Sequence, residues 1–495
     1  MKRACWCILP LLHCIAALAE PAFELRFVDA DTGRGIPLVE AWTVNDIPYV
    51  SDSQGRIAFD EPGLLGRRVF FRLRSHGYEM PKDGLGMVGV RVRTEAGGRA
   101  EFKLRRINIA ERLYRITGQG IHADSVRLGH EAPIANPLLN GEVVGQDSTQ
   151  AAVYRGRIRW FWGDTSRASY PLGHFQTAGA VSLLPTDGGL DPQLGVDLDY
   201  FTNKEGFSRP MAPMKKGSLV WIDGLLTVPD AREAPTMLSH FSRRKSLAVQ
   251  QEHGVLRYDD DKETFVRANT LNLEETWRHP RGQATSHNGY VYFAHPFATT
   301  RVKARAEQAL APNAYEALTL TTNKTGGLVY AWRKQGEPIA QKTEATRIKN
   351  SPREQPAPLL QLRDARSGKP VLAHAGSIRW NAHRQRWILI VTEHYGSSFL
   401  GEVWYAEAPE IIGPWGPAVK IATHEKYSFY NPVHHAFFDQ EGSRFIHFEG
   451  TYTKMFSGNN IATPRYDYNQ IMYRLDLDDA RLKAAWGKSE KQAVP

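Results

Sequence analysis

Five short, aromatic-rich stretches that each lead into a polar residue most constrain how this chain of 495 residues can fold. They read GRIRWFWGDT, GSLVWIDGLL, GYVYFAHPF, QRWILIVTEH and SRFIHFEGTYT. Each combines a turn with a strand of mostly apolar residues, and the units recur at intervals of roughly 55 to 100 residues. All but the second follow another candidate strand. A degenerate repeat of this kind predicts β-sheet blades, and five units predict a five-bladed β-propeller.

The polar residues of the five units are Asp164, Asp223, His295, Glu393 and Glu449. Equivalent strand ends of a propeller reach the same rim, so we expect these side chains to converge on one face and to bind substrate there. The alternative is that each is a solvated turn residue, which is the better interpretation for any single unit taken alone.

The rest of the chain divides into segments of different pattern. Residues 20–107 predict a β-sandwich, because strands such as FELRFVDA alternate apolar and polar residues between turn sequences such as DADTG. Residues 108–129 are expected to form a linker in which NIAERLYRI makes one or two helical turns. The propeller is expected over residues 130–480, with a further unit possible within 311–365, and residues 481–495 form a C-terminal tail.

The first 19 residues predict export. A cationic start, Met1-Lys2-Arg3, precedes an apolar run and a small-residue cleavage site at Ala17-Leu18-Ala19. The alternative is an anchor that is never cut. All three cysteines lie inside this segment, so the mature chain has neither disulfides nor thiolate sites. We expect a secreted or periplasmic protein with no transmembrane segment once the signal is removed.

Charge and motifs exclude several classes of function. The formal charge is +9, and removing Lys2 and Arg3 leaves 60 basic against 53 acidic residues. No dense basic block occurs, so nucleic acid is not expected as a partner, whereas a mild preference for anionic glycans is. The chain lacks a G-x-S-x-G elbow, an H-E-x-x-H helix and a P-loop. Neither a cofactor nor a catalytic metal is expected, although a structural cation in the propeller channel is possible.

The first unit carries the strongest catalytic pattern. In GQDSTQAAVYRGRIRWFWGDT, Asp147 is placed on the innermost strand and Asp164 at the end of the next, with a tight turn at Arg155-Gly156 between the strands. Adjacent antiparallel strands can bring both carboxylates to one rim, and a carboxylate pair is what cleavage of a glycosidic bond requires. The alternative is that both residues serve as turn and capping residues.

The last unit adds further candidates. Glu449 ends an apolar strand and is a candidate general acid, or else a buried residue that fixes the last blade. His434 and His435 must point to opposite faces of a strand, so at most one faces the channel. The loop that contains Arg465, Tyr466 and Asp467 is either a sugar-binding loop or a closure loop that fastens the propeller.

The motif of the first unit resembles a known family. The pattern GQDS…AVYRGRIRWFWGDT is similar to the opening blade of the domain of unknown function 4185, some members of which are counted as glycoside hydrolase family 183 and act as endo-D-arabinanases. The resemblance implies a five-bladed propeller with a carbohydrate-active site, and it carries that family's two aspartates onto Asp147 and Asp164. The layout is also similar to that of glycoside hydrolase families 43 and 32, whose inner-strand carboxylates perform the chemistry.

The N-terminal segment has a resemblance of its own. DADTGRGIPLVEAW…YVSDSQGRIAF resembles the prealbumin-like, or carboxypeptidase-regulatory-like, sandwiches attached to secreted bacterial enzymes, which implies an accessory role.

Three classes of function therefore remain open. The first is hydrolysis of a polysaccharide or oligosaccharide, with Asp147 and Asp164 as the central pair and Glu449 as a further catalytic candidate. The second is a non-catalytic glycan-binding propeller whose rim carboxylates only accept hydrogen bonds from hydroxyl groups. The third is a structural or adhesive protein of the cell envelope.

Overall fold

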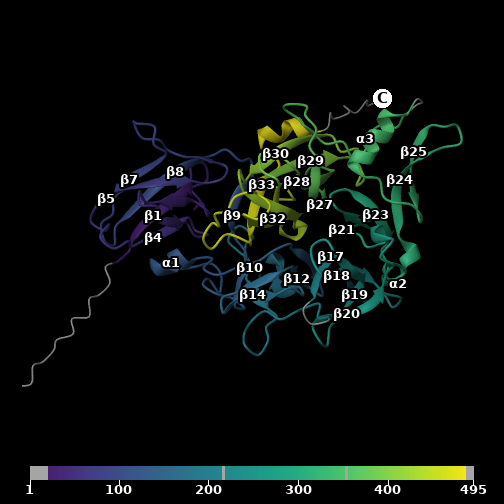
Figure 1. The fold of residues 1–495 in the computed structure, drawn as a ribbon, viewed down its shortest axis with the longest axis horizontal. Coiled ribbons are helices and arrows are strands. Elements are labelled where there is room, and N and C mark those ends of the chain that lie inside the picture. The colour runs from purple at the N-terminus through teal and green to yellow at the C-terminus, as the bar shows by residue number, and fades with distance from the viewer. Residues whose placement is uncertain (1–20, 215–217, 352–354, 487–495) are drawn as a thin grey trace, which may run out of the picture.

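The computed structural model describes residues 21–214, 218–351 and 355–486 (Figure 1). Strands dominate these residues and helices are short, as the prediction of an all-β chain requires. The expected signal peptide and the three cysteines lie outside the described residues. No helix in the described ranges is long and apolar enough to cross a membrane.

Two four-stranded sheets form the N-terminal part of the molecule. In spatial order they are β4 (Arg56–Phe59), β1 (Phe23–Asp29), β8 (Arg99–Arg106) and β6 (Tyr78–Glu79), and β3 (Pro48–Val50), β2 (Glu40–Trp42), β5 (Arg68–Arg74) and β7 (Gly89–Arg93). Along β5 buried and exposed residues alternate, as expected for a strand with one face on a core. Phe27 and Phe71, one from each sheet, are fully buried in the same hydrophobic cluster.

Six further sheets follow along the chain. They are: β10 (Val143–Gln146), β13 (Thr165–Arg167) and β14 (Tyr170–His174); β11 (Gln150–Tyr154), β12 (Arg157–Trp162), β15 (Ala178–Leu183) and β16 (Asp199–Tyr200); β17 (Leu219–Pro229), β18 (Pro235–Arg244), β19 (Gln250–Asp259) and β20 (Thr264–Thr270); β21 (Gln283–His287), β22 (Tyr290–Ala294), β23 (Ala298–Lys303), β24 (Glu316–Thr322) and β25 (Leu328–Arg333); β26 (Arg363–Asp364), β30 (Pro417–Thr423), β29 (Glu402–Ala408), β28 (Arg386–Glu393) and β27 (Ala373–Asn381); and β31 (Ser428–His434), β32 (Phe445–Thr453), β33 (Asn469–Asp476) and β9 (Glu111–Arg115).

The five aromatic-rich stretches predicted as strands are strands β12, β17, β22, β28 and β32, and each lies in a different sheet. Four of them pair with the strand that directly precedes them in the chain, whereas β17 is the first strand of its sheet, in keeping with the absence of a candidate strand before it. The segment 311–365 adds β24 and β25 to the sheet of β22, and it also contains helix α3 (Gln341–Lys349). Within its described residues this segment does not form a sheet of its own.

The turn between β11 and β12 shows how local sequence sets the register. Arg155 and Gly156 both have positive φ, 51° and 73°, and Tyr154 pairs directly with Arg157. Two such residues match the right-handed twist of a hairpin, and glycine adopts this conformation without steric cost. The expected tight turn at this position is therefore present.

The prediction of helical turns in NIAERLYRI is wrong. Residues Glu111–Arg115 form β9, which pairs antiparallel with β33 near the other end of the chain. All five residues of β9 are buried, so burial against two sheets outweighs the weak local preference for helix. The last sheet thus contains both β9, which precedes the strands of the other five sheets of this part of the chain, and β33, which follows them.

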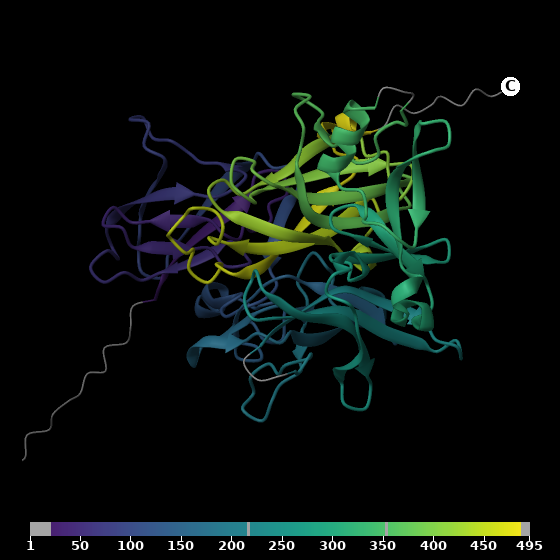
Figure 2. The ribbon, with the colours of Figure 1, turned by 45° about the vertical axis from the view of Figure 1, so that its right-hand side comes forward.

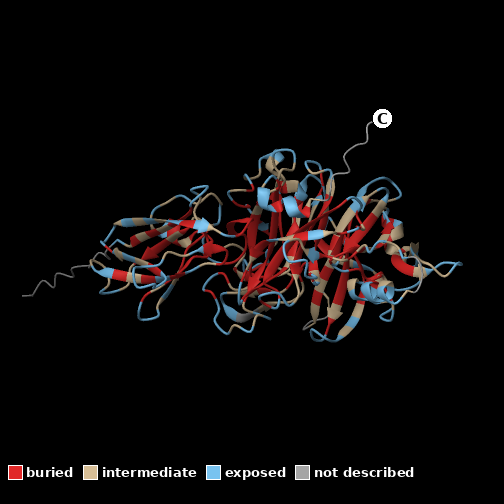
Figure 3. Ribbon diagram, turned by 90° about the horizontal axis from the view of Figure 1, so that it is seen from above, coloured by how far each residue is buried: buried red, intermediate tan, exposed pale blue. Residues whose placement is uncertain are grey.

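The two N-terminal sheets pack against this last sheet. His76 lies 3.0 Å from the hydroxyl of Tyr452, and the Tyr466 hydroxyl donates to the carbonyl of Ser51 at 2.8 Å. Figures 1 and 2 show the purple N-terminal strands beside the yellow C-terminal ones in both views. Figure 3 shows that buried residues fill the strands while exposed residues follow the loops.

The helices are short and peripheral. Besides α3 they are α1 (Ala123–Arg127), α2 (Ala306–Leu310) and the 3-10 turns Pro185–Asp187, Thr276–Arg278, Pro312–Ala314, Ala436–Phe438 and Ala480–Ala485. The last of these turns falls within the expected C-terminal tail, where Leu482 and Ala485 are buried in the hydrophobic cluster of the last sheet.

One cavity connects five of the sheets. It measures about 240 Å³, and its wall includes residues from a strand at the edge of each sheet: Ala151 of β11, Leu226 of β17, Thr285 of β21, Arg379 of β27 and His434 of β31. These five edge strands therefore line one cavity. A smaller hollow of about 60 Å³ is lined by Gln150, Asp223, Gln283 and Gly376, which lie nearer the N-terminal ends of four of the same strands.

Candidate active site

Asp147 and Asp164 come together beside the sheet of β11 and β12. Asp147 lies in the loop just before β11, rather than on the innermost strand as expected, and Asp164 follows the end of β12 as predicted. The backbone N–H of Asp164 donates to Oδ1 of Asp147 at 3.0 Å, and the N–H of Gly163 donates to the carbonyl of Asp147 at 2.7 Å. Both side chains are half-buried, so they are desolvated without being sealed from solvent.

The carboxylate of Asp147 is held by several donors. The hydroxyl of Tyr430 donates to Oδ2 at 2.8 Å, and that of Ser148 lies 3.3 Å from the same oxygen. Asp164 has a different partner: the indole N–H of Trp221 donates to its Oδ1 at 2.9 Å. Three sheets thus meet at the pair, because Tyr430 belongs to β31 and Trp221 to β17.

The electrostatics of the two carboxyls are coupled. Burial raises the pKa of Asp147, while hydrogen bonds from Tyr430, Asp164 and Tyr468 oppose the rise. Burial and the charge of Asp147 together raise the pKa of Asp164 to about 7, against the opposing effect of Trp221. Asp147 therefore accepts more hydrogen bonds than Asp164 does, and the raised pKa lets Asp164 keep its proton up to about pH 7.

Strained backbone surrounds the pair. Ser148 and Tyr468 have positive φ of 57° and 63°, and so does Asn431, whose side-chain amide donates to the Ser148 hydroxyl at 2.9 Å. Residues other than glycine rarely adopt this conformation, and the cost is on the order of 1–3 kcal/mol each. Gly163 is also constrained, since a Cβ there would lie 2.4 Å from Oδ1 of Asp147. The unfavourable backbone conformations around the site thus lower the stability of the fold while they hold the carboxylate of Asp147 in position.

Asp223 lies in the neighbouring small hollow. It sits within β17 at a shift in register, and its Oδ1 accepts the backbone N–H of Gly282 at 3.2 Å. Burial raises its pKa to about 6, although that hydrogen bond and the charges of Arg281 and Arg244 lower it. The expectation that Asp223 occupies the same type of strand end as the other candidates is wrong, because β17 is the first strand of its sheet.

His295 lines the same hollow as Asp223, as expected for convergent residues. Packing around its ring, together with the charges of Arg281 and His374, lowers its pKa to about 4, so the imidazole is neutral at pH 7. Glu393 follows the pattern less closely. Its Oε2 accepts the indole N–H of Trp404 at 2.8 Å, burial raises its pKa, and it lines neither of the hollows described above.

Glu449 is not part of this site. It is fully buried, and its Oε1 lies 2.6 Å from Nε2 of His435, whose ring packs against Trp160. A polysaccharide cannot reach a carboxylate that is enclosed on all sides, so the geometry favours the structural alternative for Glu449. His434 points the other way, into the 240 Å³ cavity, where its Nε2 lies 2.8 Å from Asp439. The two histidines therefore occupy opposite faces, as the alternation of a strand requires.

The loop of Arg465, Tyr466 and Asp467 is turned towards the protein rather than towards a ligand. Arg465 pairs with Asp124 at 3.2 Å, and Tyr466 is buried beneath the guanidinium of Arg115. Asp467 Oδ1 accepts the backbone N–H of Lys454 at 2.7 Å. Each polar group is thus engaged in fastening the last sheet, and the expected role in substrate binding lacks geometric support.

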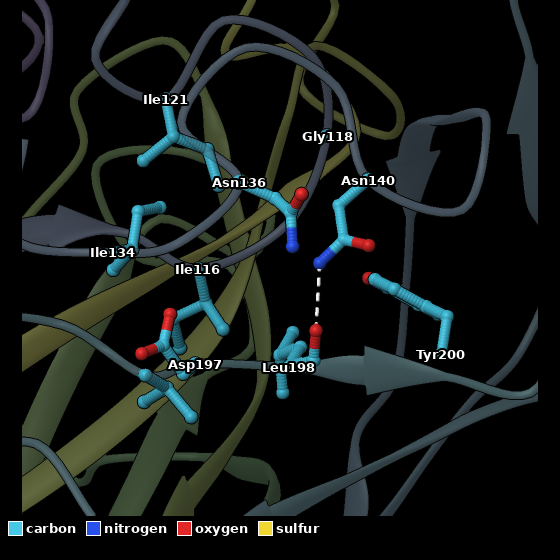
Figure 4. Close-up of a pocket in the computed structure, with 10 residues that line it drawn as sticks. Ile116, Gly118, Ile121, Ile134, Asn136, Asn140, Asp197, Leu198 and Tyr200 are labelled. Atoms are coloured by element: carbon cyan, nitrogen blue, oxygen red, sulfur yellow. Dashed lines mark hydrogen bonds between the residues drawn. The ribbon is translucent and has the colours of Figure 1, made fainter.

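Figure 4 shows a different hollow, at the junction between the segment after β9 and the strand β16. Asn140 crosses it and donates to the carbonyl of Leu198 at 2.7 Å. Its volume of about 10 Å³ holds at most a single water molecule. This hollow is therefore excluded as a sugar site. In the described residues no group of three or more His, Cys, Asp or Glu side chains is arranged to hold a metal ion.

Several residues of the Asp147 site were not predicted from the sequence. They are Ser148, Trp221, Tyr430, Asn431 and Tyr468. Tyr430 is 283 positions from Asp147 in the chain, so only the tertiary arrangement of the sheets brings them together. The one available signal was Asn431-Pro432, a turn-like pair inside the inner strand of the last unit.

Comparisons with known proteins give structural matches alone. No family model matches the chain, and no curated protein does. The exo-beta-1,3-galactanase from Phanerochaete chrysosporium with galactose matches with a TM-score of 0.37 at 9% identity, over 74% of this chain and 65% of that one. An exo-1,5-alpha-L-arabinanase from a bovine ruminal metagenomic library matches with a TM-score of 0.32 at 9% identity, over 68% of this chain and 94% of that one.

The GH43_1 enzyme from Xanthomonas citri complexed with xylotriose matches with a TM-score of 0.33 at 11% identity, over 68% of this chain and 88% of that one. At these TM-scores and identities the similarities establish neither an activity nor a substrate for this chain.

Proposed function

We propose that this protein is a glycoside hydrolase in which Asp147 and Asp164 carry out the chemistry. The observation that carries the proposal is the difference between the two carboxyls of one coupled pair: several donors stabilise Asp147 as an anion, whereas the pKa of Asp164 is raised to about 7. Two carboxyls whose environments separate their protonation states are the general requirement for glycosidic cleavage.

Each carboxyl then has one role. Protonated Asp164 delivers its proton to the glycosidic oxygen as the C–O bond breaks, so the leaving sugar departs as a neutral alcohol. Ionised Asp147 acts on the anomeric carbon, either by direct attack or by removing a proton from a water molecule that attacks. Tyr430 and Ser148 hold the carboxylate of Asp147 in place, and Trp221 holds that of Asp164.

The architecture within this proposal is an N-terminal β-sandwich followed by a five-bladed propeller. The five sheets that contain β11, β17, β21, β27 and β31 are the blades, and the common cavity lined by these edge strands supports a shared axis. Pairing of β9 with β33 closes the ring. The proposal includes export to the periplasm or the exterior and a polysaccharide or oligosaccharide as substrate.

A glycan panel tests the activity. Purified mature protein is incubated with arabinans, galactans, xylans and uronic-acid polysaccharides, and the products are separated by chromatography. We expect new oligosaccharides from at least one glycan with the wild type and none with Asp147→Asn. Product released equally by both proteins would refute the assignment to Asp147. Glycan retention without any product from the wild type would establish the non-catalytic alternative instead.

A further inference from the structure

A large hollow lies beside the Asp223 pocket and shares His295 with it. Its volume is about 600 Å³, roughly ten times that of the Asp223 pocket at about 60 Å³. Apolar walls come from Trp277 and Phe297, and the polar groups that face it include Arg281, Lys342 and His374. A cavity of this size with apolar walls and a few polar groups has the dimensions of a small-molecule site.

Arg281 is the distinctive residue of this hollow. It is exposed, and in the described part of the chain its guanidinium makes no ion pair and no hydrogen bond. Its position is nevertheless central, because its charge acts on Asp223 and also on His295. Residue Gly282, next to it in sequence, donates its N–H to Asp223. Arg281 thus lines the large hollow, next in the chain to Gly282, which lines the small one.

Asp223, on whose carboxyl the charge of Arg281 acts, lines the small hollow and not the large one. Burial lowers the pKa values of His279, His374 and His295, that of His295 to about 4 with a further contribution from the charge of Arg281, so all three rings are neutral at pH 7. Lys342 supplies a second cation and Glu337 a single carboxylate, and both are exposed at the edge of the hollow. In the lining of the large hollow, the cations Arg281 and Lys342 therefore outnumber the single carboxylate of Glu337, while Asp223 lies in the adjoining small hollow.

We propose that this hollow binds a sugar unit that bears a carboxylate, so that the substrate of the enzyme is a uronic-acid-containing polysaccharide. The inference rests on the proposed hydrolase function and names its substrate class. A planar guanidinium with five N–H donors matches a carboxylate in a two-pronged geometry, which favours a uronate over a neutral sugar. The aromatic wall at Trp277 gives the same sugar ring an apolar surface to pack on.

The test measures binding separately from turnover. In an Asp147→Asn background, affinity is measured by calorimetry for oligosaccharides of polygalacturonate, alginate and glucuronoxylan, and for the same oligosaccharides after chemical reduction of their carboxyl groups. Arg281→Gln is compared with Arg366→Gln, since Arg366 is also exposed but lies outside the hollow. Affinities for dextran sulfate and for uncharged dextran are also compared. Because dextran sulfate is a polyanion without carboxylates, this comparison separates recognition of a carboxylate from attraction to any polyanion.

We expect at least one uronate oligosaccharide to bind about tenfold more tightly than its reduced form, and Arg281→Gln to remove that difference while Arg366→Gln changes it less than twofold. Equal affinity for all uronate and reduced forms would overturn the inference, and so would equal losses in the two variants. An Arg281-dependent preference for dextran sulfate equal to that for uronates would overturn the assignment to a carboxylate.

Failure of the hydrolase proposal has a different signature. In that case the wild-type protein releases no product from any glycan, whatever effect the two arginine substitutions have on binding. A neutral glycan that is cleaved in an Asp147-dependent manner, with no effect of Arg281→Gln, would retain the hydrolase and discard the uronate site.

Discussion

Two carboxylates of this chain, Asp147 and Glu449, were both candidate catalytic residues in the sequence, yet their surroundings in the fold are opposite. Asp147 is half-buried and is surrounded by donors from three separate segments of the chain. Glu449 is fully buried against His435, and its Oε2 has no hydrogen-bond partner. The comparison teaches that an acid beside an apolar strand of a repeated unit does not by itself predict whether its site opens to a substrate.

Substitution of Asp147 gives the largest expected effect and tests whether this half-buried carboxylate is catalytic. Asp147→Asn should lower turnover by about three orders of magnitude or more, because an amide cannot supply the charge or the basic oxygen needed in the transition state. The fold should persist, since asparagine keeps the same shape. Turnover is measured by product chromatography and folding by circular dichroism. Near-normal turnover on a cleaved glycan would move the active site elsewhere.

Substitution of His435 tests the structural role of Glu449, the fully buried carboxylate. His435→Ala removes the only hydrogen-bond partner of the Glu449 carboxylate in the described residues and leaves an acid enclosed by protein. Leaving a buried carboxyl group without its hydrogen-bond partner costs about 1–3 kcal/mol of unfolding free energy. Urea unfolding measures the loss, and turnover per folded molecule should stay unchanged. A protein of unaltered stability that has lost its activity would instead place Glu449 in the mechanism.

Some features of the molecule could be predicted from the sequence, and others could not. The β12 strand and the Arg155-Gly156 turn followed from local pattern, since a strand and a two-residue hairpin depend on neighbours in the chain. The pairing of β9 with β33 and the contact of Tyr430 with Asp147 depend on closure of the sheets, which no local pattern encodes. The same limit applies to Arg465 and Tyr466, for which a sugar-binding loop and a closure loop were both open from the sequence, and whose contacts with Asp124 and Ser51 fit the closure loop.

Substitution of Asp164 sharpens the contrast within the open site. Asp164→Asn should lower turnover about a hundredfold on natural glycans and less on aryl glycosides, whose leaving groups need no proton. Wild-type turnover should fall as pH rises through about 7, where the carboxyl loses its proton. A pH–rate profile on both substrate types checks this. Equal losses on the two types would exclude proton donation by Asp164.

The same carboxyl predicts a stability effect of known sign. Because the folded-state pKa of Asp164 is raised from 3.8 to about 7, the folded state binds this proton more tightly than the unfolded state. The free energy of unfolding therefore falls as pH rises from about 4 to 7, and this fall should be smaller in the Asp164→Asn variant. A smaller slope remains, because the pKa of Asp223 is raised to about 6. Urea unfolding at pH 5 and pH 8 measures it, and identical slopes in both proteins would contradict the raised pKa of Asp164.

Substitution of Gly163 gives the smallest expected effect and tests how finely Asp147 is positioned. A Cβ at residue 163 would lie 2.4 Å from Oδ1 of Asp147, so Gly163→Ala must displace the carboxylate or the loop. We expect about tenfold lower kcat with little change in KM, since sugar binding does not depend on the exact direction of this oxygen while attack does. Gly416→Ala is the matched control, because a Cβ there meets no atom within 4 Å and its φ is not positive. If Gly163→Ala behaves like this control, the contact between Gly163 and Asp147 does not govern catalysis, and the donors from Tyr430 and Ser148 are sufficient to hold the carboxylate.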